Sequence, residues 1–207
     1  PNWNWMAYPV SFNMSVNEAF VNHKPSHGDI LKSQTKVCQY YEGVGWMGEL
    51  EIMEPGKGYM YQSNAQESIT FPYPNMGSTR GARNERNAEK YWDVDETKYS
   101  TNMNVIAIVM QDGKEVSDCE VAAFYEDECR GSARPMYIEQ LDRYLTFLTI
   151  HGEGGETLKF KYYDIHTGEV SDLLNEMTYE VDGINGEVAN PYIFGNNISD
   201  INAIGEV

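Results

Sequence analysis

The feature that most restricts the fold of this chain is the recurrence of short strand-like runs between glycine-rich and proline-rich corners. Turn signals follow one another about every 8 to 12 residues, a spacing typical of small β-sandwiches and barrels. Aromatic residues, which fit the pleated surface of a sheet, are abundant, with 15 Tyr, 7 Phe and 4 Trp. The sequence therefore predicts a mainly β fold. The expected strands cover residues 3–8, 29–32, 36–41, 47–53, 58–62, 104–111, 120–125, 129–137, 144–152, 158–165, 178–180 and 192–194. Hairpin turns are expected at residues 111–114, 152–155 and 166–168.

One short helix is predicted near the start of the chain. Ser15 and Glu18 have the S-x-x-E spacing of a capping box, in which the hydroxyl and the carboxylate satisfy the first free amides of a helix. The helix is expected over about residues 16–23, and it should end before Pro25. Its buried residues are expected to be Val16, Ala19 and Phe20.

The composition changes between residues 75 and 100, where apolar residues are few. The charged residues of this stretch include Arg80, Arg83, Arg86 and Lys90, followed by Asp93, Asp95 and Glu96. The sequence thus predicts a β-rich module with the helix at residues 1–76, a charged connector at 77–99 and an antiparallel β-sandwich module at 100–207. Both modules should be small and sandwich-like or barrel-like. The alternative is one larger sandwich that carries the charged stretch as a long functional loop.

The charge balance restricts the class of partner. The chain has 32 acidic and 15 basic residues, a formal net charge of −17. A field of that sign repels phosphate backbones and anionic lipid, so nucleic acids are not expected as partners. The longest clear apolar run, residues 105–110, is far shorter than a membrane-spanning helix, and no membrane insertion is expected. The chain begins PNWNW, without an initiator methionine or signal peptide, and we expect it to be a piece of a longer exported protein.

Two short groups of carboxylates are the candidates for a metal site. They are Asp93, Asp95 and Glu96, and Glu126, Asp127 and Glu128. Neither group has the spacing of a calcium-binding loop, and in an acidic chain such groups are usually solvated turns. The first group stays as the alternative metal site. The four histidines have no zinc-binding spacing; they are His23, His27, His151 and His166.

The sequence contains no motif that marks a catalytic centre. A G-x-S-x-G elbow and a phosphate-binding loop ending in Lys-Ser or Lys-Thr are missing, and the glycines of GEGGE do not match a dinucleotide fingerprint. Function has to be argued from a site, so the chain is expected to be no enzyme and to need no cofactor. A hydrolase whose site the sequence does not mark stays as a third alternative.

The three cysteines, Cys38, Cys119 and Cys129, do not form a disulfide framework. If Phe124 pairs with Cys129 across a hairpin, Cys119 lies too far along the strand to bridge Cys129, although a bulge could change this. A bond between these two cysteines is left open. Cys38 is expected to pack as a small apolar side chain.

Aromatic side chains of the first module are the candidates for a binding surface. Sugars stack on exposed Trp and Tyr rings, and the candidate residues are Trp3, Trp5, Trp46 and Tyr61. The alternative is that these rings form the core of a small domain. For Trp46 the core is the favoured interpretation.

Several runs together resemble a known type of module. WNWMAYPV, SVNEAF, GDILKSQT, GWMGEL and EPGKGYMY resemble a module that recurs in large secreted and cell-surface proteins of Bacteroidetes-type bacteria. NMNVIAIVM, CEVAAFYEDECRG and NPYIF resemble a second module that often follows it. The resemblance implies an extracellular or cell-surface location and an accessory role beside other domains. The resemblance implies no catalytic residue, and a cysteine at position 119 is not typical of the second module.

The resulting hypothesis is a non-catalytic binding, adhesion or spacer module of a larger surface protein. It should act as a monomer with a glycan or protein ligand outside the cell. The alternative is a carbohydrate-binding accessory module of a glycan-degrading enzyme.

Overall fold

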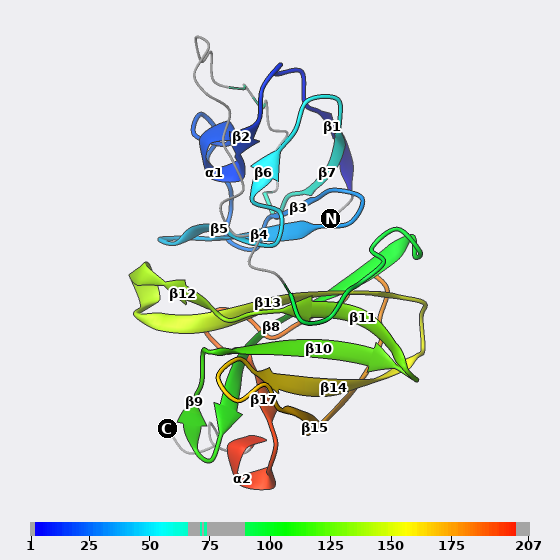
Figure 1. The fold of residues 1–207 in the computed structure, drawn as a ribbon. Helices are drawn as coiled ribbons and strands as arrows, with labels where there is room; N and C mark the ends of the chain where they lie inside the picture. The colour runs from blue at the N-terminus through cyan, green and yellow to red at the C-terminus, as the bar shows by residue number, and fades with distance from the viewer. Residues whose placement is uncertain (1–2, 66–70, 72, 74–89, 202–207) are drawn as a thin grey trace. The chain divides into compact units, whose positions relative to one another are not determined.

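The computed structural model describes residues 3–65, 71, 73 and 90–201. The chain folds into two compact units, Pro1–Asn87 and Ala88–Val207, each of which is described by itself. In Figure 1 the first unit runs from blue to cyan and the second from green to red. Almost all regular structure is strand, so the predicted mainly β fold is confirmed. Residues 77–89 of the expected connector lie outside the described residues.

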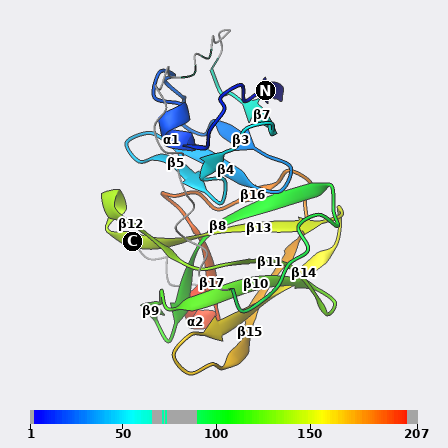
Figure 2. The same ribbon diagram turned by 45° about the horizontal axis from the view of Figure 1, so that its top comes forward.

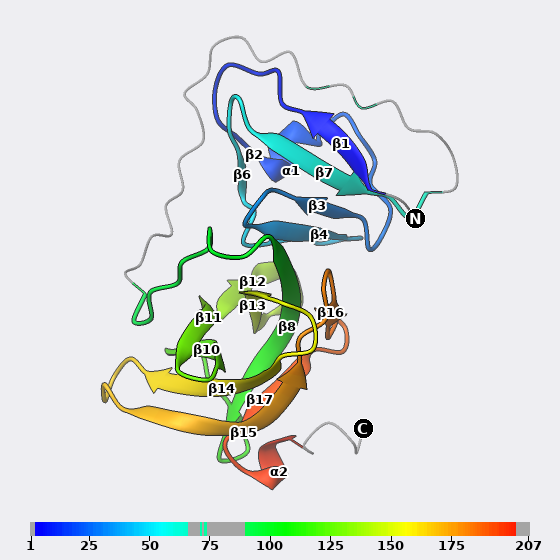
Figure 3. The same cartoon turned by 90° about the vertical axis from the view of Figure 1, so that its right-hand side faces the viewer.

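The first unit contains a five-stranded antiparallel sheet in the order β1-β7-β3-β4-β5. Figure 3 shows β1, β7, β3 and β4 side by side. Beside this sheet lie the two-stranded pair β2–β6 and the helix α1. The elements are β1 (Asn4–Ala7), β2 (Met14–Ser15), α1 (Val16–Ala19), β3 (Ile30–Lys32), β4 (Val37–Tyr41), β5 (Gly45–Gly48), β6 (Ile52–Met53) and β7 (Gly58–Gln62).

The capping box predicted for α1 is confirmed. The backbone amide of Glu18 donates to Ser15 Oγ at 3.2 Å, and the Ser15 amide donates to Glu18 Oε2 at 3.0 Å. The helix is shorter than predicted because it ends at Ala19 instead of near residue 23. After it, Val21 donates to the carbonyl of Glu18 in a tighter turn. This segment, FVNH, has weak helix propensity.

Aromatic and apolar side chains fill the core of the first unit. On β7, Tyr59 and Tyr61 point inward and are buried, whereas Gly58 and Met60 alternate with them. Cys38 packs in this core as a small apolar side chain, as predicted. The core residues are Tyr8, Met14, Val16, Ala19, Phe20, Leu31, Cys38, Trp46, Leu50, Met53, Tyr59 and Tyr61.

The second unit is a sandwich of two sheets, shown as two layers in Figure 2. One sheet has the order β11-β10-β14-β15, and the other has the order β12-β13-β8-β16, with β9 and β17 also paired to β8. The strands are β8 (Thr101–Gln111), β9 (Lys114–Glu115), β10 (Cys119–Tyr125), β11 (Glu128–Ala133), β12 (Met136–Ile138), β13 (Arg143–Gly152), β14 (Thr157–Asp164), β15 (Val170–Thr178), β16 (Ile184–Asn185) and β17 (Tyr192–Gly195). The helical turns are η1 (Glu139–Leu141) and α2 (Ile198–Ile201).

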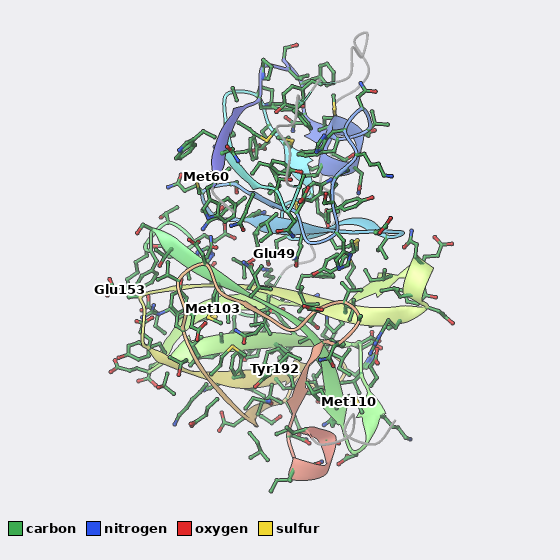
Figure 4. All side chains as sticks on the ribbon, turned by 180° about the vertical axis from the view of Figure 1, so that it is seen from behind. Glu49, Met60, Met103, Met110, Glu153 and Tyr192 are labelled. Atoms are coloured by element: carbon green, nitrogen blue, oxygen red, sulfur yellow. The ribbon has the colours of Figure 1, made fainter. Side chains whose placement is uncertain are left out.

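Alternating residues of both sheets face one another across the sandwich. The fully buried Met103, labelled in Figure 4, belongs to this core. The other core residues are Val105, Ala107, Val109, Cys119, Val121, Ala123, Ala133, Leu148, Ile150, Leu158, Phe160, Tyr162, Leu173, Tyr179 and Phe194. The two units thus have distinct core clusters.

The sandwich is not wholly antiparallel, which corrects one prediction. The strands β16 and β17 run parallel to β8. Parallel pairing needs a long crossover connection. Here the whole four-stranded sheet lies between β8 and β16 in the chain and provides that crossover.

Two predicted strands are each divided between separate sheets. The run 47–53 breaks after Gly48, whose φ is +141°, and its parts become β5 and β6. The run 129–137 breaks at Pro135, and its parts become β11 and β12. The turn at residues 152–155, predicted as a hairpin, instead connects β13 in one sheet to β14 in the other. The hairpin turns at 111–114 and 166–168 are confirmed.

The edge strand β15 was almost wholly missed, because the predicted run 178–180 overlaps it only at Thr178. Its inward positions include Leu173 and the polar Asn175, so the sequence lacks the apolar alternation of a strand. The side chain of Asn175 joins the two sheets. It donates to the carbonyl of Ile193 at 2.8 Å and accepts from the amide of Gly195 at 2.9 Å.

The change Asn175→Ala should therefore destabilise the second unit by about 1–3 kcal/mol, because it leaves buried backbone groups of β17 without partners. Denaturant unfolding measures the loss. Exposed Glu176 lies next in the chain, and Glu176→Ala should cost less than about 0.5 kcal/mol. Equal losses in the two variants would contradict this role for the Asn175 side chain.

All three cysteines are free. Phe124 pairs with Cys129, the condition under which Cys119 lies too far along the strand to bridge Cys129, and a bulge lies between Ala123 and Phe124. Cys119 packs in the core, whereas Cys129 lies opposite Phe124 on the outer face of the sheet. The two sulfur atoms therefore lie on opposite faces of one sheet, which explains why they form no bond.

Candidate functional site

Two of the predicted binding residues are core side chains. Trp46 and Tyr61 are buried, and their ring centroids lie 4.7 and 5.7 Å from that of Phe20. The Tyr61 hydroxyl donates to the buried carboxylate of Asp29 and lies 3.1 Å from Nε2 of His23. Burial and the hydrogen bond to Asp29 raise the pKa of Tyr61 above its usual range. Neither ring is free to stack on a ligand, so both are removed from the candidate binding surface; for Trp46 this agrees with the core interpretation that the sequence favoured.

The other two predicted residues lie at an edge of the sheet in the first unit. Trp5 is 80% exposed on the edge strand β1, opposite Met60 of β7. Trp3 is half-buried, and the ammonium of Lys32 lies 5.7 Å from its ring centroid. Among the described residues, Trp5 has no aromatic neighbour that would hold its ring in place. An isolated exposed ring is a common surface feature and does not define a site.

The carboxylates proposed as an alternative metal site do not form one. Oδ1 of Asp95 accepts hydrogen bonds from the amide and the hydroxyl of Thr97, at 3.1 and 2.7 Å. These bonds lower the pKa of Asp95 and make it a turn residue. Within the described ranges, no group of three or more His, Cys, Asp or Glu side chains is arranged to hold a metal ion.

The structure gathers four aromatic side chains on the outer face of the four-stranded sheet, a cluster that we call the aromatic platform. Tyr91 stacks on Tyr163, with ring centroids 3.9 Å apart and ring planes 12° apart. Trp92 meets both rings edge-on, at 5.1 Å from Tyr91 and 6.1 Å from Tyr163. Its ring centroid also lies 5.9 Å from that of Phe124. The members of the platform are Tyr91, Trp92, Phe124 and Tyr163.

The alternation of β10 decides which residues support the platform. Its odd-numbered residues belong to the core, so Glu120, Ala122 and Phe124 face outward. Glu120 lies directly opposite Tyr163 of β14 on the same face. Glu120 and Ala122 are nevertheless fully buried, because residues 90–92 lie over them.

A buried carboxylate anchors the segment that carries Tyr91 and Trp92. The two oxygens of Glu120 accept from the backbone amides of Tyr91, at 2.9 Å, and of Trp92, at 3.2 Å. Nε of Arg134 donates to the same carboxylate at 3.0 Å and compensates its charge. Lys90 donates to the carbonyl of Ser132 at 2.6 Å. This part of the expected connector is therefore a fixed element of the second unit.

The platform has one open ring face with polar groups beside it. Tyr91 is 51% exposed although one side of its ring rests on Tyr163. The ammonium of Lys161 lies 4.9 Å from the Phe124 centroid, and within the described part of the chain it has no carboxylate partner. Asp172 lies across from Lys161 on β15. The available chemistry is noncovalent: stacking on Tyr91 and hydrogen bonding beside it.

A polar pocket lies elsewhere on the second unit. It has a volume of about 620 Å³ and is lined by Gln111, Tyr162, Asp164, Thr167, Glu169, Val170, Ser171 and Asn196. Its carboxylate Asp164 accepts from the amides of His166, at 2.8 Å, and Thr167, at 2.9 Å. These bonds hold the β14–β15 turn and lower the pKa of Asp164. The carboxylate thus stabilises a turn.

The prediction from sequence missed the platform because it assigned Tyr91 and Trp92 to a connector. A usable signal was present: an adjacent aromatic pair inside a charged stretch. A second signal was Tyr163, which the alternation of KFKYYD places outside the core. Their meeting depends on the register of β10 and β14 and could not be read from either segment alone.

No helix in the described part of the chain is long and apolar enough to cross a membrane. A comparison with models of known protein families found no match, and neither did comparisons with curated proteins and with solved structures. The function therefore has to be inferred from the geometry of the aromatic platform.

Proposed function

We propose that the chain is a non-catalytic binding module of an exported protein and that it holds its ligand on the aromatic platform. The observation that carries the proposal is the Tyr91 ring, which is half exposed yet stacked on Tyr163 and fixed through its backbone to buried Glu120. A solvent-exposed aromatic side chain that the fold holds in place is typical of a recognition site.

The platform is pre-organised for a weak ligand. Ordering a free side chain costs about 0.5–1.5 kcal/mol on binding, and this cost is already met for Tyr91 in the folded chain. A shallow site of this size buries little surface, so we expect a dissociation constant on the order of 0.1–1 mM. Such affinities suit a module that acts beside other domains, where several weak contacts act together.

The location outside the cell rests on other observations. The resemblance to accessory modules of secreted and cell-surface proteins supports it. The net charge of −17 bears on the class of ligand, because it disfavours nucleic acids and anionic lipid. The carboxylate of Glu120, which anchors the segment that carries Tyr91 and Trp92, is held in a structural contact with Arg134. This arrangement favours recognition over acid–base chemistry.

The test compares the whole chain with the variant Tyr91→Ala. Retention should be measured on immobilised extracellular polysaccharides and matrix proteins, with the release of hydrolysis products followed in parallel. Loss of one stacked ring should weaken retention by about tenfold on the ligand that the native chain binds, with the melting temperature nearly unchanged.

The matched control is Tyr137→Ala on β12, because Tyr137 is 48% exposed, close to the 51% of Tyr91, but lies outside the platform. It should bind like the native chain. Retention that does not depend on Tyr91, or the release of products by the native chain, would overturn the proposed function.

A further inference from the structure

We infer that the ligand of the aromatic platform is a polysaccharide of uncharged pyranose sugars. This inference rests on the proposed function and names the ligand class of the same site. The carbohydrate-binding role, an alternative from the sequence, is thereby moved from the first module to the second. Its residues are Tyr91, Tyr163 and Lys161.

The first argument is the shape of the open surface. Tyr163 covers one side of Tyr91, at a centroid distance of 3.9 Å and with nearly parallel planes, so a ligand can stack only on the other side. The open surface is a flat apolar face the size of one ring. The C–H face of a pyranose matches such a face. A protein partner would instead need about 800 Å² per side with an apolar centre.

The second argument is the hydrogen-bonding capacity beside the ring. Lys161 lies two residues before Tyr163 on the same face of β14, so its ammonium and the stacked rings share one surface. The Lys161 ammonium lies over the face of the Phe124 ring, and this contact leaves the N–H groups of Lys161 able to donate hydrogen bonds. The hydroxyls of a sugar chain bound on this face can accept from it.

The third argument is the charge of the outer face. Basic and acidic residues are arranged in opposite pairs: Arg134 with Glu120 at 3.0 Å, Lys159 with Glu176 at 3.9 Å, and Lys161 across from Asp172. Each of these three basic residues thus has an acidic residue bonded to it or across from it, which weakens the attraction of the face for a charged ligand. At longer range the net charge of −17 repels polyanions. An uncharged sugar chain needs no attracting field, and the net charge of the protein does not repel it.

The experiment is affinity electrophoresis of the whole chain in gels that contain one soluble polysaccharide each. The uncharged probes are hydroxyethylcellulose, galactomannan, xyloglucan and laminarin, and the acidic probes are polygalacturonate and alginate. We expect retardation by at least one uncharged probe, with less than a twofold change in affinity between low and high salt, because no ion pairs are screened.

The variants separate stacking from hydrogen bonding. Tyr91→Phe keeps the ring and should keep binding within about twofold, whereas Tyr91→Ala should lose about tenfold. Lys161→Met should lose about fivefold. The controls are Tyr137→Ala and Lys114→Met, which change an exposed tyrosine and an exposed lysine elsewhere and should leave the affinity unchanged.

Each other outcome overturns the inference in a distinguishable way. Salt-sensitive binding of the acidic probes alone, or Tyr91-dependent binding of immobilised proteins alone, would reject the uncharged glycan and leave the proposed function standing. Glycan binding that is lost in Trp5→Ala and kept in Tyr91→Ala would move the site to the first unit and reject both. Absence of any Tyr91-dependent binding would also reject both.

Discussion

Replacing Arg130 by methionine is expected to destabilise the second unit by about 3–5 kcal/mol, the usual cost of removing one partner from a buried ion pair. Only 4% of the Arg130 side chain is exposed. Its guanidinium binds Glu156 through two parallel bonds, Nη1 to Oε2 at 3.2 Å and Nη2 to Oε1 at 2.9 Å. Without Arg130, the largely buried Glu156 carboxylate loses this partner.

Further contacts hold the guanidinium in place. It lies over the ring of Tyr99, at 4.1 Å from the centroid, and 5.2 Å from that of Tyr125. Nε lies 3.3 Å from Oε2 of Glu128, close enough for an ion pair but without hydrogen-bond geometry. Glu128 is also held by Lys98 and by the hydroxyl of Tyr99, so the site is a network.

The measurement is hydrogen exchange of peptides from each unit, together with denaturant unfolding. The matched control is Arg143→Met, which breaks the more exposed pair with Glu115 at 3.3 Å and should cost less than about 1 kcal/mol. The double variant Arg130→Met, Glu156→Gln should recover part of the loss, because it removes the unpaired charge. A small loss, equal to that of Arg143→Met, would show that the buried pair adds little to stability.

Replacing Phe20 by alanine should destabilise the first unit by about 3–5 kcal/mol, as large-to-small changes of buried aromatic residues do. Phe20 follows α1 and is almost fully buried. Its ring centroid lies 4.7 Å from that of Trp46, 4.4 Å from Phe71 and 5.7 Å from Tyr61. The change removes the ring that these three side chains share, and the remaining rigid rings cannot close the cavity.

The next residue provides the control for Phe20→Ala. Val21 is 68% exposed, and Val21→Ala should change the free energy of unfolding by less than about 0.5 kcal/mol. Because the two units have distinct core clusters, Phe20→Ala should speed exchange in residues 30–62 and Arg130→Met in residues 101–178. Exchange that rises in both ranges after either change would contradict two separately stable cores.

Local sequence signals predicted much of the fold. The capping box of Ser15 and Glu18 needs only residues that are close in the chain, and it formed as expected. The same holds for the hairpin turns at 111–114 and 166–168. Where a buried polar residue replaces an apolar one, as Asn175 does in β15, the local pattern no longer shows the strand.

The binding candidates show the limit of such signals. An aromatic residue predicts burial and ligand stacking equally well, since both use the apolar ring. In the structure Trp46 and Tyr61 fill the core, while Tyr91, from a stretch that looked like a connector, lies exposed on the sheet. Only the alternation of β10 and its register with β14 decided which rings stay accessible.

By itself, the sequence determined what depends on neighbouring residues: a mainly β fold, most strand positions and the capped helix. The tertiary structure decided what depends on distant residues. It divided the strands between two sheets, made β16 and β17 parallel to β8, and kept Cys119 and Cys129 on opposite faces. It also placed Tyr91 on Tyr163, more than 70 residues away in the chain. Such contacts form only when the free energy gained by burying the whole sheet face outweighs the entropy lost in closing long loops. A local sequence pattern does not show this balance, because it depends on residues that are far apart in the chain.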